Sequence, residues 1–256
     1  MKQLVKLPFP WQVFIENSGC DTILTQARAR LCRIQDAAER NFDHWQSPPL
    51  WLKKIIAPVV GLTSFSDVKF LEKKINLHHE NFVFEICELI FSAKKAMPLQ
   101  IKFRNENLIR SKRTFSNIMP GIRVLEYCPP YRIEEELRAM IIAAQRHCHL
   151  DGLLLSMIIS ANFVSVHPFT DGNGRASRFL LKELLREIGL WKQPTLPIEF
   201  LISNNRRSYV LALNSLIVGA RTDYFIEYFS NLITAAAELY VIEQYLKYCR
   251  NTAYEG

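Results

Sequence analysis

Residues 167–178 read His-Pro-Phe-Thr-Asp-Gly-Asn-Gly-Arg-Ala-Ser-Arg, and this stretch decides both the expected fold and the expected chemistry. Its two glycines, Gly172 and Gly174, permit backbone angles at which successive N–H groups turn toward one point and can bind an anion. We expect a helix to begin at Arg175, so that its unpaired N–H groups and positive dipole end add to the same place. The stretch therefore predicts a loop that binds a polyphosphate.

Side chains in the same stretch supply the other parts of a nucleotide site. Arg175 and Arg178 are three residues apart, so on a helix both guanidinium groups face one side and can grip phosphate oxygens. Asp171 offers the hard carboxylate oxygen that Mg²⁺ prefers beside phosphates. His167 stands at the loop entrance with an imidazole that can accept a proton near neutral pH. We expect Phe169 to anchor the loop in the core.

The rest of the chain predicts helices around this loop. Gly and Pro are sparse, at 9 and 12 of 256 residues, and apolar residues recur at three- and four-residue spacing. The pattern favours an all-α protein with helices at residues 21–42, 80–95, from about 132, 153–166, 175–188, 206–218 and 223–248.

One stretch breaks the helical pattern, at residues 113–127. Apolar and β-branched residues there surround Met119-Pro120-Gly121, which is a turn signal between two short extended runs. We predict a small β-hairpin that turns at these three residues and is closed by Pro129-Pro130.

Composition narrows the class of protein. Apolar residues make up 49% of the chain, which excludes disorder and low-complexity repeats as the main state. The most apolar stretch, residues 153–166, is shorter than the ~20 residues that cross a bilayer, so we expect a buried helix and no membrane span. Scattered cysteines and no signal peptide favour a cytoplasmic-type, reducing compartment; the six are Cys20, Cys32, Cys87, Cys128, Cys148 and Cys249.

Neither the net charge nor the cluster of histidines predicts a further function. The whole excess of +7 lies in residues 1–113, which hold 18 Lys and Arg against 11 Asp and Glu. These residues are dispersed, so a solvated basic surface is favoured over a site for an acidic protein or a membrane, and nucleic-acid binding is not expected. His147-Cys148-His149 with Asp151 is too crowded to surround a tetrahedral zinc ion, and we interpret it as a capped helix end.

The motif at 167–178 resembles the active-site signature of the Fic (filamentation induced by cAMP) family, His-Pro-Phe-x-Asp-Gly-Asn-Gly-Arg-x-x-Arg, at every specified position. The hairpin that ends in Tyr127-Cys128-Pro129-Pro130 is similar to the family's flap, and residues 203–209 are similar to its polar segment near the nucleotide. The resemblance implies a Fic domain at 105–235, a mostly helical, basic extension at 1–104 and a C-terminal helix or tail at 236–256.

This resemblance implies a protein adenylyltransferase that moves AMP from ATP to a Ser, Thr or Tyr hydroxyl of a target protein. His167 would be the general base and Asp171 would bind Mg²⁺, while the target would dock on the flap near residues 114–127 by strand addition. Gly174 favours adenylylation, because phosphorylating members carry Lys there. The residues implied to bind the nucleotide are Gly172, Asn173, Gly174, Arg175, Arg178, Asn205 and Tyr209.

The sequence leaves open how the enzyme is inhibited and which nucleotide is the donor. Many Fic proteins silence themselves with Ser/Thr-x-x-x-Glu-Gly/Asn, and the nearest match is Asn-Thr-Ala-Tyr-Glu-Gly at residues 251–256, from which Glu255 would reach Arg178. The alternatives are an antitoxin-like partner or no inhibition. Another nucleoside triphosphate or CDP-choline could be the donor, or the chain could be a nucleotide-dependent interaction module without turnover. Family members serve as toxins, secreted effectors or housekeeping regulators, and the sequence identifies neither the target nor the oligomeric state.

Overall fold

A computed structural model of the chain describes residues 2–6, 20–40, 103–116, 119–146, 151–217 and 222–254. The helix predicted at 80–95, the His147-Cys148-His149 cluster and the tail residue Glu255 lie outside these ranges.

Helices dominate the described residues, as predicted. They are α2 (Asp21–Glu39), α5 (Ile133–Arg146), α6 (Gly152–Val166), α7 (Asn173–Glu187), α8 (Ile198–Asn204), α9 (Arg206–Ile217) and α10 (Thr222–Tyr254), with a single 3₁₀ turn, η2 (Pro130–Arg132), before α5. Six of these helices begin within two residues of the predicted starts. The seven-residue α8 was not predicted, because so short a helix shows too little periodicity.

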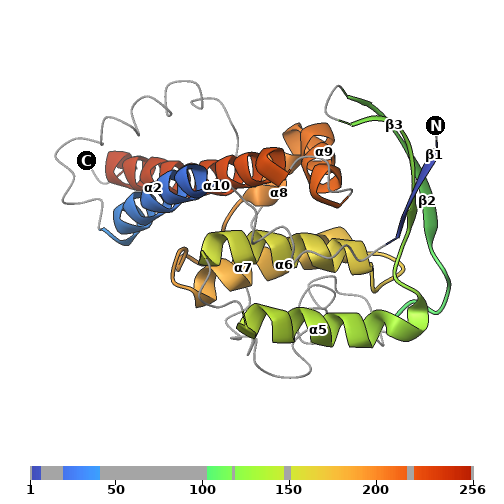
Figure 1. Ribbon diagram of the computed structural model, residues 1–256. Helices are drawn as coiled ribbons and strands as arrows, with labels where there is room; N and C mark the ends of the chain where they lie inside the picture. Colours follow the sequence, from blue (N-terminus) through green and yellow to red (C-terminus); the bar gives the residue numbers. More distant parts are fainter. Residues whose placement is uncertain are drawn as a thin grey trace.

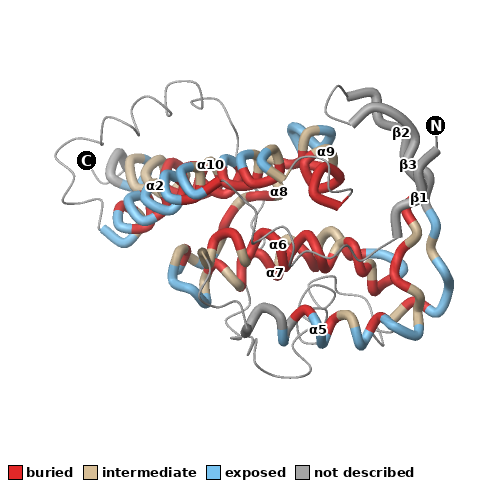
Figure 2. Tube along the Cα trace, viewed as in Figure 1, coloured by how far each residue is buried: buried red, intermediate tan, exposed pale blue. Residues whose placement is uncertain are grey.

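The helices form layers around the segment that carries the motif. In Figure 1, α6 and α7 lie between α5 on one side and the pair α2 and α10 on the other, and α2 packs directly on α10. Nearly every residue of α6 is buried (Figure 2), which confirms the prediction of a buried apolar helix at this position. The motif loop between α6 and α7 therefore follows a helix that is buried along nearly its whole length.

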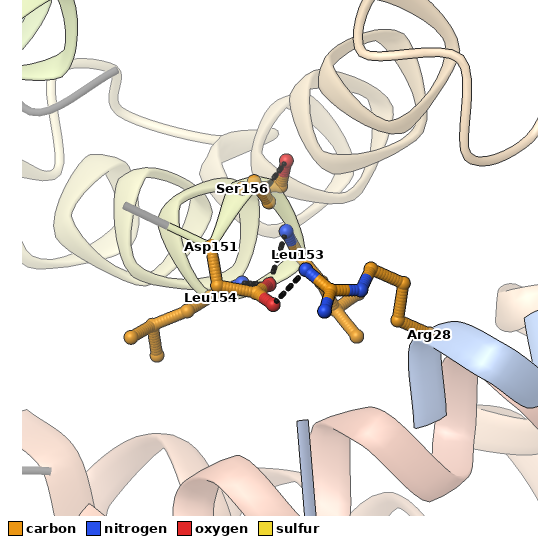
Figure 3. Close-up of polar contacts among 6 residues, drawn as sticks. Arg28, Asp151, Leu153, Leu154 and Ser156 are labelled. Atoms are coloured by element: carbon orange, nitrogen blue, oxygen red, sulfur yellow. Dashed lines mark hydrogen bonds and ion pairs between the residues drawn. The ribbon is translucent and has the colours of Figure 1, made fainter. Parts of the chain in front are cut away.

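Asp151 fixes the start of α6 (Figure 3). Its Oδ1 accepts hydrogen bonds from the backbone N–H groups of Leu153 at 2.9 Å and Leu154 at 3.2 Å, and its Oδ2 lies 3.0 Å from Nη1 of Arg28 on α2. The predicted capped helix end is confirmed. The same carboxylate links the N-terminal helix α2 to the helix that leads into the motif.

A three-stranded sheet stands at one end of the helices (Figure 1). Strand β2 (Ile109–Ser116) pairs antiparallel with β3 (Met119–Glu126), and this hairpin is named the flap below. Strand β1 (Lys2–Lys6) pairs parallel with the other edge of β3, which gives the order β1-β3-β2. The hairpin was predicted, but β1 was not, because a parallel partner so far along the chain leaves no local signal.

The predicted position of the hairpin turn was wrong. Met119, Pro120 and Gly121 lie inside β3, with Pro120 opposite Phe115, and the chain reverses between Ser116 and Met119. Proline is tolerated there because β1 pairs with β3 only from Ile122 onward, so that Pro120 has a neighbouring strand on one side only.

The long helix α10 belongs to the core. Among the described residues, it alone is long and apolar enough to cross a membrane, yet 78% of that window is buried inside the protein. Residues of α2, α6, α9 and α10 share one hydrophobic cluster. Helix α10 continues past residue 235 without a break. The predicted domain boundaries at 104/105 and 235/236 stay predictions.

Candidate active site

His167 ends α6 in a strained backbone conformation. Its φ of 54° and ψ of 57° are left-handed, and it is the one non-glycine residue of the described ranges with a positive φ. Such a conformation costs on the order of 1–3 kcal/mol and persists only where the surroundings hold it. The N–H of His167 donates to the carbonyl of Phe163 at 3.1 Å, so the turn closes the helix.

The imidazole of His167 is held from two directions. Its Nδ1 lies 3.2 Å from the carbonyl oxygen of Val164, and its ring centroid lies 4.6 Å from that of Tyr127, the residue after β3. Because a carbonyl can only accept, we assign the proton of the neutral ring to Nδ1, which leaves the lone pair on Nε2. Nε2 is therefore the basic atom of this half-buried side chain.

Phe169 anchors the loop in the core, as predicted. It is 3% exposed, and its ring centroid lies 6.2 Å from that of Phe163 and 5.9 Å from that of Phe103. These rings belong to a second hydrophobic cluster, built from α5, α6, α7 and the residues just after β3.

Asn173 clamps the same loop. Its Oδ1 accepts a hydrogen bond from the N–H of Phe169 at 2.9 Å, and its Nδ2 donates to the carbonyl of Phe169 at 2.7 Å. The side chain is buried. The side-chain amide of Asn173 is thus used inside the loop, and the predicted contact of this residue with the phosphates stays a prediction.

The two glycines of the loop do different things. Gly172 has a φ of 86° and is the N-cap of α7, which begins at Asn173, two residues earlier than predicted. Gly174 lies in the first turn of α7 without a positive φ, so the expected special backbone angle is absent there. A Cβ at Gly174 would lie 3.3 Å from Nη1 of Arg178. One glycine therefore makes the turn, and the other leaves room for an arginine.

The charged residues of the motif form two ion pairs. Oδ2 of Asp171, whose side chain is 91% exposed, lies 3.0 Å from Nη2 of Arg175. Nε of Arg178, on the next turn of α7, lies 3.5 Å from Oε1 of Glu199 on α8. The other oxygen of Glu199 accepts a hydrogen bond of 2.7 Å from Nζ of the buried Lys182. Sequence reasoning missed Glu199, since it stands outside every recognised motif.

The pKa values of Glu199 and Lys182 reflect the ion pairs that Glu199 makes with Arg178 and Lys182. Burial acts to raise the pKa of Glu199, but the charges of Lys182 and Arg178 outweigh it and the pKa lies below its ordinary value. Burial lowers the pKa of Lys182, and Glu199 opposes that effect. The carboxylate of Glu199 is therefore charged at neutral pH and neutralises part of the positive potential at the N-terminus of α7.

Of the two residues predicted to bind the nucleotide outside the motif, Tyr209 is buried and Asn205 is exposed. Tyr209 is buried, and burial raises the pKa of its hydroxyl, while the neighbouring Arg178 and Ser177 act to lower it. The hydroxyl of Tyr209 therefore lies beside the motif arginine. Asn205 is exposed at the start of α9, where its Oδ1 accepts a hydrogen bond from the N–H of Ser208 at 3.2 Å. A nucleotide contact from Asn205 stays a prediction.

The carboxylate of Asp171 fits a metal ion that binds together with a nucleotide. No group of three or more His, Cys, Asp or Glu side chains that could hold an ion occurs in the described part of the chain. Mg²⁺ in nucleotide sites takes one or two carboxylates and completes its shell with phosphate oxygens and water. The single exposed carboxylate of Asp171 therefore fits an ion that arrives with a polyphosphate, and it does not fit a permanent protein-bound ion.

Comparisons with known proteins point to one family. Residues 79–185 match the model of the Fic/DOC family, a range that includes the flap, α5, α6 and the motif loop. A curated relative from Aquifex aeolicus (strain VF5), named probable protein adenylyltransferase aq_aa38, is 35% identical over 92 residues. That alignment covers 36% of this chain and 26% of the relative, so the chain spans about a quarter of its length.

A solved structure shares the fold. The crystal structure of a Fic family protein from Desulfovibrio desulfuricans G20 aligns with a TM-score of 0.53 and 17% sequence identity, over 91% of this chain and 70% of that one. At this identity the likeness shows the fold. The predicted fold class, a Fic-fold helical core with a small hairpin, is confirmed.

Proposed function

Because this chain carries a domain of the Fic/DOC family, we propose that it is a protein adenylyltransferase, an enzyme that moves AMP from ATP to a hydroxyl of a target protein. The observation that carries the proposal is the turn from His167, which ends α6, into the N-terminus of α7, whose first turns carry Arg175 and Arg178. A general base, an anion-binding turn and cationic side chains are the parts that such a transfer needs.

In the proposed reaction, Nε2 of His167 accepts the proton of a Ser, Thr or Tyr hydroxyl while the hydroxyl oxygen attacks the α-phosphorus of ATP. The bond between the α-phosphorus and the oxygen that bridges to the β-phosphate breaks, and pyrophosphate leaves. The N–H groups at the start of α7 and the side chains of Arg175 and Arg178 stabilise the charge on the phosphates. Asp171 would hold Mg²⁺, which when bound neutralises phosphate charge.

Two contacts must change when ATP binds in this way. Arg175 exchanges the carboxylate of Asp171 for a phosphate oxygen, and Asp171 is then available to the metal. Arg178 shares its charge between Glu199 and the leaving pyrophosphate. The side chain of Asp171 is almost fully exposed, so the first exchange costs little.

The target docks, in this proposal, on the edge of β3. Strand β1 occupies that edge along residues Ile122–Glu126. Since β3 ends beside Tyr127, whose ring touches His167, a strand on that edge lies one spacing of about 4.8 Å from β3, whereas a strand added outside β2 lies two spacings away. We infer that a target segment takes the place of β1.

The proposal includes the compartment in which the protein acts. The four cysteines of the described ranges, Cys20, Cys32, Cys128 and Cys249, form no disulfide, which supports a reducing, cytoplasmic-type compartment for a toxin, an effector or a regulator. An antitoxin-like protein that contributes a carboxylate to Arg178 remains a candidate inhibitor, as does Glu255 of the tail.

The test is transfer of labelled phosphate in a cell extract. The protein is incubated with Mg²⁺ and ATP labelled at the α or the γ position, beside His167→Ala and the control His44→Ala, a histidine outside the matched family region. Labelling of a protein by the α phosphate, lost only in His167→Ala, is the expected result. Transfer of the γ label would make the chain a kinase, label from CDP-choline would change the donor, and ATP binding without any transfer would make it an interaction module.

A further inference from the structure

Arg104 is a buried arginine that the proposed reaction does not use directly. It is 4% exposed, and the hydrogen bonds of its guanidinium in the described part of the chain go to backbone carbonyls. Nε donates to His167 at 2.8 Å and Nη1 to Glu106 at 2.6 Å, while Nη2 donates to Cys128 and, at 3.4 Å, to Val166.

Three of these acceptors lie in the two segments that meet at His167, which are the end of α6 and the residues after β3. Val166 and His167 end the helix α6, where the last carbonyls have no partner inside the helix and the helix dipole is negative. Cys128 follows Tyr127, whose ring contacts the imidazole of His167. A single guanidinium thus joins the end of α6 to the base of the flap.

The backbone of Arg104 adds a further tie to the same loop. Its N–H donates to the carbonyl of Pro168 at 2.9 Å, and the neighbouring Phe103 packs on Phe169. Arg104 therefore holds the carbonyl of Pro168 as well as the carbonyl of the peptide bond between His167 and Pro168. The left-handed backbone of His167, from which the direction of its imidazole follows, lies directly before that bond.

We infer that Arg104 is a positioning residue for His167, because it holds the strained turn that aims the imidazole and ties this turn to the flap. The inference rests on the proposed function only in what the imidazole is aimed at. Lysine cannot replace this arginine, since a point charge on a flexible stem lacks the planar fork that reaches carbonyls in three segments at once.

The test compares Arg104→Lys and Arg104→Gln with the control Arg138→Lys, an exposed arginine of α5 whose guanidinium pairs with Glu134. The first readout is the Hε1 proton resonance of the His167 ring, assigned with His167→Ala and measured without nucleotide. We expect it to move away from its position next to the Tyr127 ring, or to broaden, in both Arg104 variants and to stay unchanged in the control.

The second readout is the kinetics of AMP transfer. We expect kcat to fall about 10- to 100-fold in Arg104→Lys, as for a misplaced reacting group, while KM for ATP stays within about twofold. A variant that keeps both the resonance and kcat of the wild type would overturn the inference. A rise of KM with an unchanged kcat would also overturn it, because it would mean that Arg104 serves nucleotide binding.

Two measures keep the result interpretable. The resonance needs neither ATP nor a target, so it tests the inference even if the protein uses another donor. If both variants fail to fold, the wild-type protein supplies the test: the Nε proton of Arg104 should exchange with solvent as slowly as the protected amides of α6. Exchange at the rate of an exposed arginine such as Arg138 would overturn the inference.

Discussion

Oε1 of Glu199 lies 3.5 Å from Nε of Arg178, so the second arginine of the motif faces a carboxylate of the same chain. The side chain of Arg178 is 17% exposed, and that of Glu199 is 40% exposed. Solvent at Glu199 weakens this pair, while the buried Lys182 holds the carboxylate in place from the other side. A polyphosphate that binds at the N-terminus of α7 must share Arg178 with Glu199.

Glu199→Gln should therefore strengthen ATP binding. The change removes one negative charge beside Arg178, and the amide oxygen can still accept a hydrogen bond from Lys182. We expect the Kd for Mg-ATP to fall about three- to tenfold, equivalent to about 0.7–1.4 kcal/mol, and the gain to shrink at high salt. Calorimetric titration at two salt concentrations measures both effects.

Glu187→Gln is the matched control for this variant. Glu187 is an exposed carboxylate in the last turn of α7, and its loss changes the net charge equally. Its Kd should stay at the wild-type value. An unchanged or weaker affinity in Glu199→Gln would show that Glu199 orients Arg178 for the nucleotide rather than competing with it.

Asn173→Ala should act on stability as well as on activity. The variant removes the two hydrogen bonds that the Asn173 side chain makes to the N–H and the carbonyl of the buried Phe169, at a cost of about 2–3 kcal/mol. For a protein of this size we expect the melting temperature to fall by about 4–10 °C. Asn231→Ala, an exposed asparagine on α10, should change it little. If Asn173→Ala melts like the wild type but loses ATP binding, its amide serves the phosphates.

The sequence predicted the motif loop and its helices because their signals are local. Residues 167–178 contain Gly172, which is the N-cap of α7, and Arg175, which pairs with Asp171 four residues before it. Helix ends were predicted from the same kind of signal, as at Asp151.

What sequence reasoning missed depends on distant parts of the chain. Strand β1 forms because one edge of β3 is open to pairing, and the residues of Lys2–Lys6 contain no local signal that predicts a parallel partner. Arg104 binds backbone carbonyls, which every residue carries, so no partner residue could be recognised. The motif also did not predict that the side chain of Asn173 bonds to Phe169, because a motif gives a residue type and a position but not the direction of a side chain.

Cys128 should make stability fall at alkaline pH. Burial and then the charge of Glu136 raise the pKa of its thiol to about 11, against the partial opposition of Arg104 and Arg132. In the unfolded chain the thiol loses its proton near the ordinary cysteine value, so between these two values only the folded state keeps the proton. Stability must therefore fall as pH rises, by up to about 1.4 kcal/mol per pH unit from this residue.

Urea unfolding between pH 8.5 and 10.5 measures this slope. Buried tyrosines act in the same direction, so the quantity to compare is the slope of the wild type minus that of Cys128→Ala. In the same range the exposed Cys32 should react with iodoacetamide long before Cys128. Equal slopes in the two proteins, or early alkylation of Cys128 in folded protein, would contradict the assignment.

Leu4→Pro should speed the modification of a target protein. Proline at the centre of β1, opposite Val124 of β3, fixes the backbone and restricts the residue before it, and so weakens the strand that covers the β3 edge. A target segment that adds to this edge then competes with a weaker occupant, and we expect its labelling to rise severalfold in the α-phosphate assay. Leu4→Ala, which keeps the N–H, should label at the wild-type rate.

A synthetic peptide with the sequence of residues 1–8 completes this test. Added to Leu4→Pro, it should compete with the target for the β3 edge and lower the labelling again, because main-chain hydrogen bonds supply most of the affinity in strand addition. Slower labelling in Leu4→Pro with no effect of the peptide would mean that β1 supports the flap, and that a target docks elsewhere, on the outer edge of β2.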